Sequence, residues 1–281
     1  MKRIFILLVT ISIISCKNTG KKEIEKIIPS VKLFVLDGGS VLVNKLEAFS
    51  QDTTYTGQSK LFADAYYVIS HPDGNLIWDA GLPENLVLDE PITEPSGTFT
   101  IHRKDSLENQ LNSIGFKVSD FKYIGLSHSH FDHTGHANYF KDATWLVQEI
   151  EYNYITNDSA QIKDPGTYNA IKDLTNVKKI NGDFDVFGDG KVVIKSMPGH
   201  TVGHQVLFLD LGLEKPILLA GDLYHFEKNR TSRGVPSFNY DVEKTLQSMD
   251  EFEAFAKEKN AEVIIQHSVE DFKKLQNILN Q

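Results

Sequence analysis

The chain has 281 residues, of which 41% are hydrophobic and 24% are charged, a composition typical of a globular protein with a buried core. This excludes an intrinsically disordered chain, a collagen and a membrane protein with several spans. The net charge of -9 argues against nucleic-acid binding, which requires a basic surface. Cys16 is the single cysteine, so disulfides and thiolate metal sites are excluded, and with ten histidines any metal must be bound by imidazole and carboxylate.

The N-terminus resembles a bacterial lipoprotein signal. Lys2 and Arg3 precede an apolar run at residues 4–14, which is shorter than the roughly 20 residues that cross a bilayer. The residues before Cys16 resemble a lipobox, so we expect a signal peptide at residues 1–15 and a lipidated cysteine with a polar tether at residues 16–30. An ordinary secretory peptide with an incidental cysteine is the alternative.

This signal predicts where the protein resides and how much charge it carries. We expect a lipid-anchored protein of the bacterial cell envelope, periplasmic or at the cell surface, which contacts the membrane only through its N-terminal lipid. Removal of residues 1–15 takes away two positive charges and no negative ones, so the net charge changes from -9 to -11.

The remaining residues, 31–281, show no linker, repeat or low-complexity segment, so we expect one domain. Apolar and β-branched runs predict strands at residues 31–36, 65–70, 76–78, 123–126, 143–147, 192–197, 206–209, 216–220 and 262–265. Hairpin signals are Asp73-Gly74 and Asp189-Gly190. Helices are predicted at residues 104–114, after Asp241 as N-cap, and at residues 271–279. Strands interrupted by helices, with both hairpins and crossovers, indicate mixed α/β layers.

Four potential metal ligands lie within six residues directly after the predicted strand at 123–126. They are His128, His130, Asp132 and His133. A lone histidine is more often structural than a ligand. Four nitrogen and oxygen donors clustered at a strand end bring no packing benefit, and their desolvation is costly unless they bind something. The cluster therefore predicts a metal site.

Three further donors each follow the end of a predicted strand: His200, Asp222 and His267. Each alone has an ordinary explanation, as a loop residue, a turn residue or a polar strand cap. In layered α/β folds, however, strand ends at one edge of a sheet lie close together, so residues distant in sequence converge there. The complete set is seven donors, which suits two metals that share a ligand and keep a position open for water. Five imidazoles and two carboxylates fit zinc best, and manganese, iron or cobalt are alternatives.

The order of these donors resembles the metallo-β-lactamase superfamily over nearly the whole predicted domain. The resemblance implies the four-layer αβ/βα sandwich of that superfamily. It also implies a first metal at His128, His130 and His200, a second at Asp132, His133 and His267, and Asp222 between the two. Asp79, after the strand at 76–78, matches an aspartate that orients ligands without binding metal.

Within the superfamily, the chain resembles the N-acyl homoserine lactone lactonases, which act in quorum quenching. Asp222 disfavours a β-lactamase, since those enzymes lack the bridging aspartate. The acidic charge disfavours a nuclease, and the 14 residues after His267 are too few for the glutathione-binding region of glyoxalase II. Supporting matches are Phe131 and the segments at residues 79–83, 145–152 and 198–205. The chain departs from these lactonases after the bridging aspartate, where they place a tyrosine at the third position and this chain has Tyr224 second and His225 third.

The resemblance implies lactone-ring opening by a metal-bridging hydroxide, with proton transfer to the leaving group by Asp222. Tyr224 or His225 is expected to stabilise the developing oxyanion. Asp132 is expected to be essential to turnover because the resemblance makes it a ligand of the second metal. Aromatic residues in the segments 42–49, 55–62 and 152–155 are candidates for an acyl-chain groove.

Other readings of the sequence stay open. A related enzyme would hydrolyse other lactones, organophosphate triesters or β-lactams, and a protein of another class would be a non-catalytic metal- or solute-binding envelope lipoprotein. We expect a small neutral lactone and no nucleic acid as partner. A homodimer is compatible with the sequence, which does not decide the oligomeric state.

Overall fold

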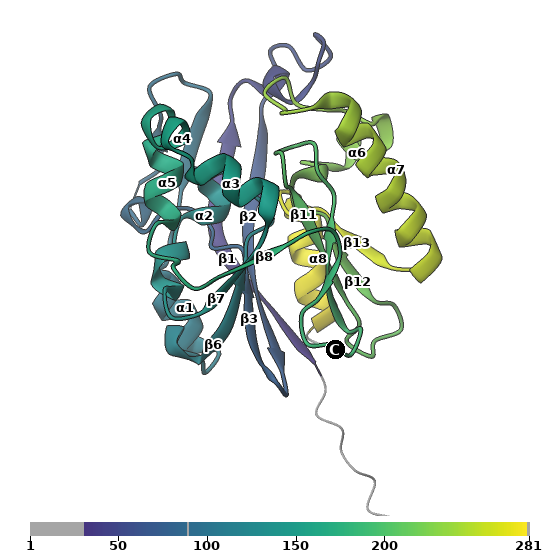
Figure 1. Ribbon diagram of the computed structural model, residues 1–281. Coiled ribbons are helices and arrows are strands. Elements are labelled where there is room, and N and C mark those ends of the chain that lie inside the picture. The colour runs from purple at the N-terminus through teal and green to yellow at the C-terminus, as the bar shows by residue number, and fades with distance from the viewer. Residues whose placement is uncertain (1–30, 89, 280–281) are drawn as a thin grey trace, which may run out of the picture.

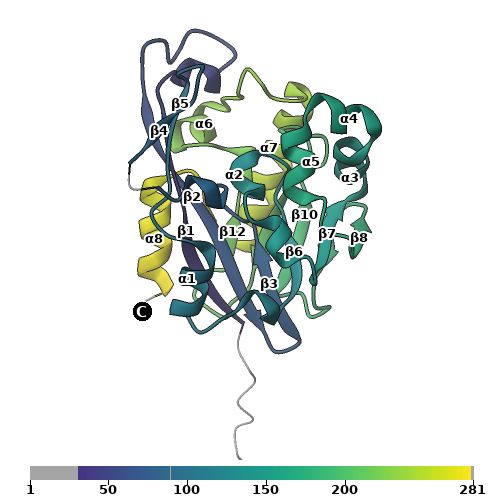
Figure 2. The ribbon, with the colours of Figure 1, turned by 90° about the vertical axis from the view of Figure 1, so that its left-hand side faces the viewer.

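The computed structural model describes residues 31–88 and 90–279, so the predicted signal peptide, Cys16 and tether lie outside the described residues. Two β-sheets face each other, and helices lie on the outer face of each sheet (Figure 1). The view turned by 90° shows α1 and α2 in front of the larger sheet and α7 behind it (Figure 2). The predicted four-layer αβ/βα sandwich is confirmed.

The larger sheet has eight strands in the order β4-β5-β1-β2-β3-β6-β7-β8. Their bounds are Lys32–Val43 (β1), Lys60–His71 (β2), Gly74–Trp78 (β3), Ile92–Thr93 (β4), Phe99–His102 (β5), Phe121–Gly125 (β6), Thr144–Gln148 (β7) and Val177–Ile180 (β8). β2 and β3 form the antiparallel hairpin predicted at Asp73-Gly74, whereas β3, β6, β7 and β8 run parallel.

The smaller sheet has five strands in the order β13-β12-β11-β10-β9. Their bounds are Phe184–Asp185 (β9), Val192–Ser196 (β10), Gln205–Leu209 (β11), Ile217–Leu219 (β12) and Glu262–Ile264 (β13). β11 is antiparallel to both β10 and β12, and β13 is parallel to β12, so β10, β12 and β13 point the same way. The hairpin predicted at Asp189-Gly190 joins β9 and β10.

The helices are short except for α7. Their bounds are Leu107–Ser113 (α1), Phe131–Thr134 (α2), Glu149–Thr156 (α3), Asp158–Lys163 (α4), Pro165–Ile171 (α5), Glu227–Ser232 (α6), Val242–Lys259 (α7) and Val269–Leu279 (α8). Turns of 3-10 helix lie at Leu46–Phe49, Glu84–Leu86, Val118–Asp120, Ala137–Phe140 and Gly221–Leu223. None of the helices in the described part of the chain combines the length and apolar character needed to cross a membrane.

Side chains alternate between the two faces of each sheet and so supply separate layers of core. On β2, Tyr67 and Ile69 point between the sheets, while Tyr66 and Val68 point toward the outer helices of the larger sheet. This period of two is the expected geometry of a strand that is buried on both faces. On the far side, the apolar stripe predicted after Asp241 packs from α7 against the smaller sheet. Both sheets are therefore covered on both faces.

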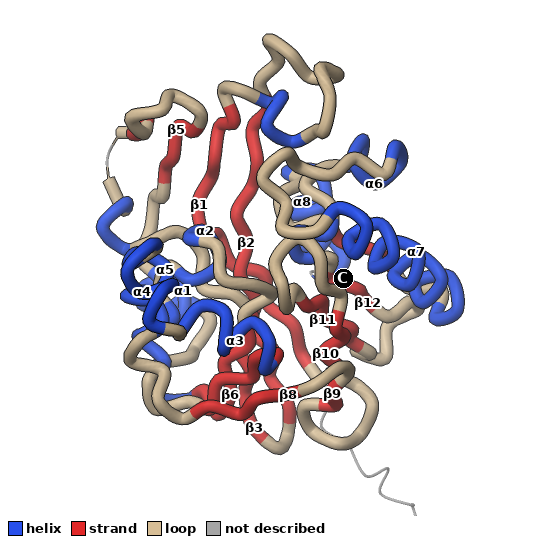
Figure 3. The backbone as a smooth tube through the Cα atoms, turned by 45° about the horizontal axis from the view of Figure 1, so that its top comes forward, coloured by secondary structure: helices blue, strands red, loops and turns tan. Residues whose placement is uncertain are grey.

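The sheets are arranged so that the ends of several strands meet at one edge. The carboxyl ends of β3, β6, β10, β12 and β13 open into long loops there, and Figure 3 shows these loops between α3 on one side and α7 on the other. Each of these five strands is followed within a few residues by a predicted functional side chain. The fold thus brings residues from both halves of the chain to one place.

Candidate metal centre

The first group of predicted ligands lies in the loops after β6 and β10. The Nδ1 atom of His130 is 2.9 Å from Nε2 of His128 and 3.0 Å from Nε2 of His200. Two nitrogens bound to one zinc at the usual bond length are about 3.3 Å apart, so this spacing suits one metal with three imidazole ligands. His128 and His200 are buried.

The second group combines one carboxylate with two imidazoles, one from the middle of the chain and one from near its C-terminal end. His133 lies on α2, which begins directly after His130, and His267 follows β13. The Nε2 atoms of His133 and His267 are 3.8 and 3.7 Å from the carboxylate oxygens of Asp132. The ligand atoms of each group lie within 4.8 Å of one another.

Asp222 lies between the two groups and presents one oxygen to each. Its Oδ2 atom is 3.6 Å from Nε2 of His128 and 3.4 Å from Nε2 of His200. Its Oδ1 atom is 3.2 Å from Nε2 of His133 and 3.0 Å from Nε2 of His267. The structure therefore brings all seven predicted ligands together, with Asp222 in the bridging position.

In the second group, the nitrogen on the far side of each imidazole ring is hydrogen-bonded, which fixes the orientation of the ring. Nδ1 of His133 lies 3.1 Å from Oδ2 of Asp79, and Nδ1 of His267 lies 2.8 Å from the backbone carbonyl oxygen of Ala63. A ring that donates from Nδ1 leaves the lone pair of Nε2 free to bind a metal. Asp79 accepts a second hydrogen bond from the backbone amide of Ser127 at 2.6 Å, so it also holds the loop before His128.

Two buried atoms at the centre are left without hydrogen bonds. Nε2 of His133 and Oδ1 of Asp222 are 3.2 Å apart, yet within the described chain neither has a hydrogen-bond partner. Buried polar atoms are rarely left unpaired unless something else binds them. Together with the donor types, these orphaned atoms fit a pair of metal ions. The residues present are those of a dinuclear metal site.

The charges in this cluster are strongly coupled. Burial alone would raise the pKa of Asp222, but the adjacent His267 and His133 imidazoles hold it well below its usual range. Burial opposes protonation of His267, but Asp222 and Asp132 raise its pKa to about 9. Burial and the charge of His133 lower the pKa of His128 well below its usual range. The ionised carboxylate at the centre thus attracts positive charge, whether from protons or from cations.

His204, outside the predicted ligand set, holds the backbone at the bridging residue. Its Nε2 atom accepts a hydrogen bond from the amide of Asp222 at 3.0 Å, and its Nδ1 atom is 3.0 Å from the carbonyl oxygen of Met197. It is fully buried. His204 therefore connects the loop after β10 to the loop after β12.

Tyr224 and His225 point in different directions. The Tyr224 hydroxyl donates to Glu253 on α7 at 3.1 Å, and its ring packs on Phe252 in the core outside the smaller sheet. Of the two alternatives for the oxyanion, Tyr224 therefore points away from the centre, because consecutive residues of this extended segment face opposite sides. His225 instead turns inward, and its Nε2 atom lies 3.1 Å from Oδ2 of Asp222.

An apolar cavity of about 370 Å³ opens onto the centre. Its walls are aromatic and aliphatic, and its floor includes candidate ligands; the lining residues are Val41, Ala48, Phe49, Phe62, Thr98, Phe99, His130, Phe131, Asp132, Asp222, His225, Phe238 and His267. Phe131 and Phe238 are 42% and 45% exposed, so they form the accessible rim. An apolar molecule could enter here and reach Asp222 directly.

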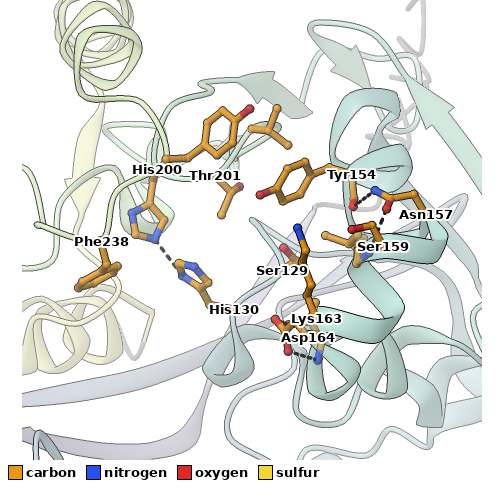
Figure 4. Close-up of a pocket in the computed structure, with 15 residues that line it drawn as sticks. Ser129, His130, Tyr154, Asn157, Ser159, Lys163, Asp164, His200, Thr201 and Phe238 are labelled. Atoms are coloured by element: carbon orange, nitrogen blue, oxygen red, sulfur yellow. Dashed lines mark hydrogen bonds between the residues drawn. The ribbon is translucent and has the colours of Figure 1, made fainter.

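A second cavity, of about 360 Å³, adjoins the centre on the side of α3 to α5 and is more polar. Figure 4 shows His130, His200 and Phe238 at one side of it and Tyr154, Asn157 and Ser159 at the other. His130 and Phe238 line both cavities, so the centre lies between them. Of the segments predicted for a groove, 42–49 and 55–62 contribute Phe49 and Phe62 to the apolar cavity, whereas 152–155 lines the polar one.

Comparison with known sequences points in the same direction. The sequence model of the metallo-beta-lactamase superfamily matches residues 60–267. The chain is 29% identical over 217 residues to N-acyl homoserine lactonase AttM of Rhizobium radiobacter, a match that covers 72% of this chain and 80% of that protein. It is 28% identical over 247 residues to an N-acyl homoserine lactonase of a Bacillus species, covering 85% and 94%.

The fold is also similar to solved structures. An N-acyl homoserine lactone hydrolase with the product N-hexanoyl-L-homoserine at its catalytic metal centre superimposes with a TM-score of 0.75 and 25% identity, covering 88% of this chain and 97% of that one. Because the family match spans most of the chain and includes every candidate ligand, this protein belongs to the metallo-beta-lactamase superfamily.

Proposed function

We propose that this protein hydrolyses the lactone ring of N-acyl homoserine lactones at a dinuclear metal centre. The observation that carries this proposal is the apolar cavity whose floor is Asp132, Asp222 and His267, since it suits an acyl chain joined to a group that reacts at the ligands. The lactonases among its relatives support it, because the match to them extends over most of both chains.

Zinc is the metal that we propose for both positions, with His128, His130 and His200 holding one ion and Asp132, His133 and His267 the other. When bound, the two ions would supply an activated water at neutral pH and polarise the substrate carbonyl. Asp222 would contact both ions, because each of its oxygens faces one group.

A side chain of the centre would transfer a proton to the leaving oxygen during the reaction. Water adds its oxygen to the carbonyl carbon, the ring carbon–oxygen bond breaks, and the leaving oxygen takes up a proton. We assign that transfer to Asp222, whose carboxylate lies at the cavity floor. The product carries one carboxylate and one hydroxyl, so a proton is released at neutral pH.

His225 would stabilise the negative charge that develops on the carbonyl oxygen. It lines the cavity, and it occupies the third position after Asp222, where lactonases of the best-known type have tyrosine. Its neighbours hold it in place, since its ring stacks on His267 at 5.7 Å and packs edge-on against Phe49 at 4.8 Å. The ring is thereby held beside the cavity before a substrate binds.

The decisive experiment is a substrate panel with the zinc-loaded soluble domain, residues 31–281. We expect acyl homoserine lactones of several chain lengths to be opened with release of one proton per turnover in a pH-stat, and a chelator to abolish this. Organophosphate triesters, β-lactams and simple lactones in the same panel test the related hydrolases. If both metals are bound and no acyl homoserine lactone is opened, the proposal is wrong.

We also propose that the protein is lipid-anchored in the bacterial cell envelope through Cys16. The support is the sequence alone, in which a basic start and a short apolar run precede the single cysteine. Membrane fractionation of the full chain beside Cys16→Ser tests it, because only the chain with Cys16 should incorporate labelled fatty acid. A homodimer stays a prediction, for which light scattering of the soluble domain is the direct measurement.

A further inference from the structure

A buried carboxylate without a catalytic role lies beside the first group of ligands. Glu151, in the first turn of α3, is only 3% exposed. Its Oε1 atom accepts a hydrogen bond from the Ser129 hydroxyl at 2.6 Å, and its Oε2 atom accepts one from the backbone amide of Gly203 at 2.7 Å. Each oxygen of Glu151 thus has its own donor, and the two donors are far apart in sequence.

Both donors belong to the loops that carry the first group. Ser129 lies between His128 and His130, and Gly203 lies three residues after His200. Gly203 also packs closely on α3, because a Cβ atom there would be 2.6 Å from Cβ of Glu151. One side chain therefore joins the two loops that together supply every imidazole of the first group.

The second group is held by different residues. His133 contacts Asp79, and Gln266, the residue before His267, donates to the same carboxylate oxygen of Asp79 at 2.9 Å. Glu151 takes part in none of these contacts. Asp79 also accepts from the amide of Ser127, but through its other oxygen. Glu151 therefore contacts only the loops of the first group, whereas Asp79 contacts His133 of the second group and, through Ser127, the loop before His128.

We propose that Glu151 is a positioning residue for the first metal ion and not for the second. This inference rests on the proposed dinuclear centre. The carboxylate fixes the distance between the loop of His128 and His130 and the loop of His200, so that the three imidazoles are arranged before a metal binds. Outer contacts of this kind typically change metal affinity by about 10- to 100-fold when they are removed.

Glu151→Gln is the sharpest test because it keeps the shape of the side chain. A glutamine has one acceptor oxygen, and the Gly203 amide can only donate, so the amide group of the glutamine must face the Ser129 hydroxyl, which then accepts instead of donating. Both contacts to the loops also lose the negative charge that strengthens them. We expect one of two zinc equivalents to bind about 10- to 100-fold more weakly in chelator competition, with the other unchanged. In the cobalt-substituted protein, the visible spectrum of one site should be lost at lower chelator concentration.

Matched variants separate positioning from general damage. Glu149→Gln, two residues earlier on α3, removes a carboxylate that bonds only to exposed Asn181 and should leave both equivalents unchanged. Asp79→Asn should weaken the equivalent held by His133, and to a smaller extent the first one, because Asp79 also contacts the backbone of Ser127. Ser129→Ala removes only one of the two hydrogen bonds to Glu151, so it should weaken the same equivalent as Glu151→Gln, by a smaller factor. It keeps the inference testable if Glu151→Gln does not fold.

The inference is overturned if Glu151→Gln and Ser129→Ala leave both equivalents unchanged, or weaken both equally. These readouts do not use lactone turnover. If the variants weaken one metal equivalent selectively but the wild-type chain opens no acyl homoserine lactone, the proposed function is wrong and the role of Glu151 still holds. A wild-type chain that binds fewer than two zinc ions would overturn both.

Discussion

Nε2 of His225 lies 3.1 Å from Oδ2 of Asp222, three residues earlier in the segment that follows β12. Asp222 sits in a 3-10 turn with its backbone bent out of helical geometry, and Tyr224 is extended. This change of backbone sends Tyr224 into the core and returns His225 to the cavity. Of Tyr224 and His225, the two residues that the sequence offered for stabilising the oxyanion, only His225 therefore faces the centre.

His225→Ala should lower kcat of lactone hydrolysis by about 100-fold with little change in KM, because removing one donor to a developing oxyanion typically costs 10²- to 10³-fold. Tyr224→Phe is the control, since its hydroxyl bonds only to Glu253, and it should leave kcat unchanged. Steady-state kinetics with hexanoyl homoserine lactone measures both. Loss of rate in Tyr224→Phe alone would reverse the assignment.

His267→Ala should remove the second metal and most of the turnover. The variant leaves Asp132 and His133 as the only ligands on that side apart from Asp222, too few for a stable site. Metal analysis after gel filtration should find close to one ion per chain instead of two. His71→Ala, a buried histidine that bonds to Asp189 outside the centre, is the matched control and should retain both. Two ions retained in His267→Ala would contradict the ligand assignment.

Phe99→Ala should change the preference for acyl-chain length. Phe99 lines the apolar cavity and is not next to any ligand. Each methylene buried in an apolar site contributes about 0.8 kcal/mol, so long chains lose more when a wall residue is removed. We expect kcat/KM to fall about 10-fold for a decanoyl substrate and hardly at all for a butanoyl one. Ile162→Ala, at an 81% exposed position outside that cavity, should change neither. An equal loss for both chain lengths would mean that the chain binds elsewhere.

Asp64→Asn should change how stability depends on pH. Asp64 is fully buried, both its oxygens lack hydrogen-bond partners among the described residues, and burial together with the charge of Asp132 raises its pKa to about 8. Between the ordinary pKa of 3.8 and about 8, the folded chain binds a proton that the unfolded chain has lost. Asp64 therefore lowers the free energy of unfolding as pH rises through that window.

The measurement is urea unfolding of the chelator-treated chain at pH 5, 6.5 and 8. In Asp64→Asn the decline with pH should be smaller by up to about 1.4 kcal/mol per pH unit, since one proton is involved. Asp73→Asn, whose side chain is exposed, should follow the wild-type profile. An unchanged slope in Asp64→Asn would show that Asp64 is ionised in the folded chain.

The sequence predicts the metal ligands of the centre better than it predicts the residues that hold those ligands in place. The ligands could be found because donors cluster at His128–His133 and because each later donor ends an apolar strand. The strand predicted at residues 31–36 is too short, since β1 continues to Val43 past an irregularity at Asp37 and Gly39. Gly38 and Gly39 suggest the end of a strand in the sequence. In the structure, however, β1 pairs with β2 on both sides of these glycines and with β5 beyond them.

Apart from Asp79, the supporting contacts could not be predicted because the environment of these residues is set by distant parts of the chain. Helix α3 has no apolar stripe, and Glu151 reads as an ordinary surface carboxylate until α3 packs on the loops after β6 and β10. The contact of His204 with the backbone of Asp222 is likewise invisible in the sequence, because the two residues lie on different loops. Burial that arises from tertiary packing leaves no local signal in the residues that it buries.

The ligands are divided almost evenly between the two sheets. Those of His128–His133 follow strand β6 of the larger sheet, while His200, Asp222 and His267 follow strands of the smaller one. Bound cations would therefore join the two halves of the sandwich at one edge, closing long loops of the chain much as disulfides do in other proteins. A chain with a single cysteine would thus gain reversible cross-links, which form or release according to the supply of metal in its surroundings.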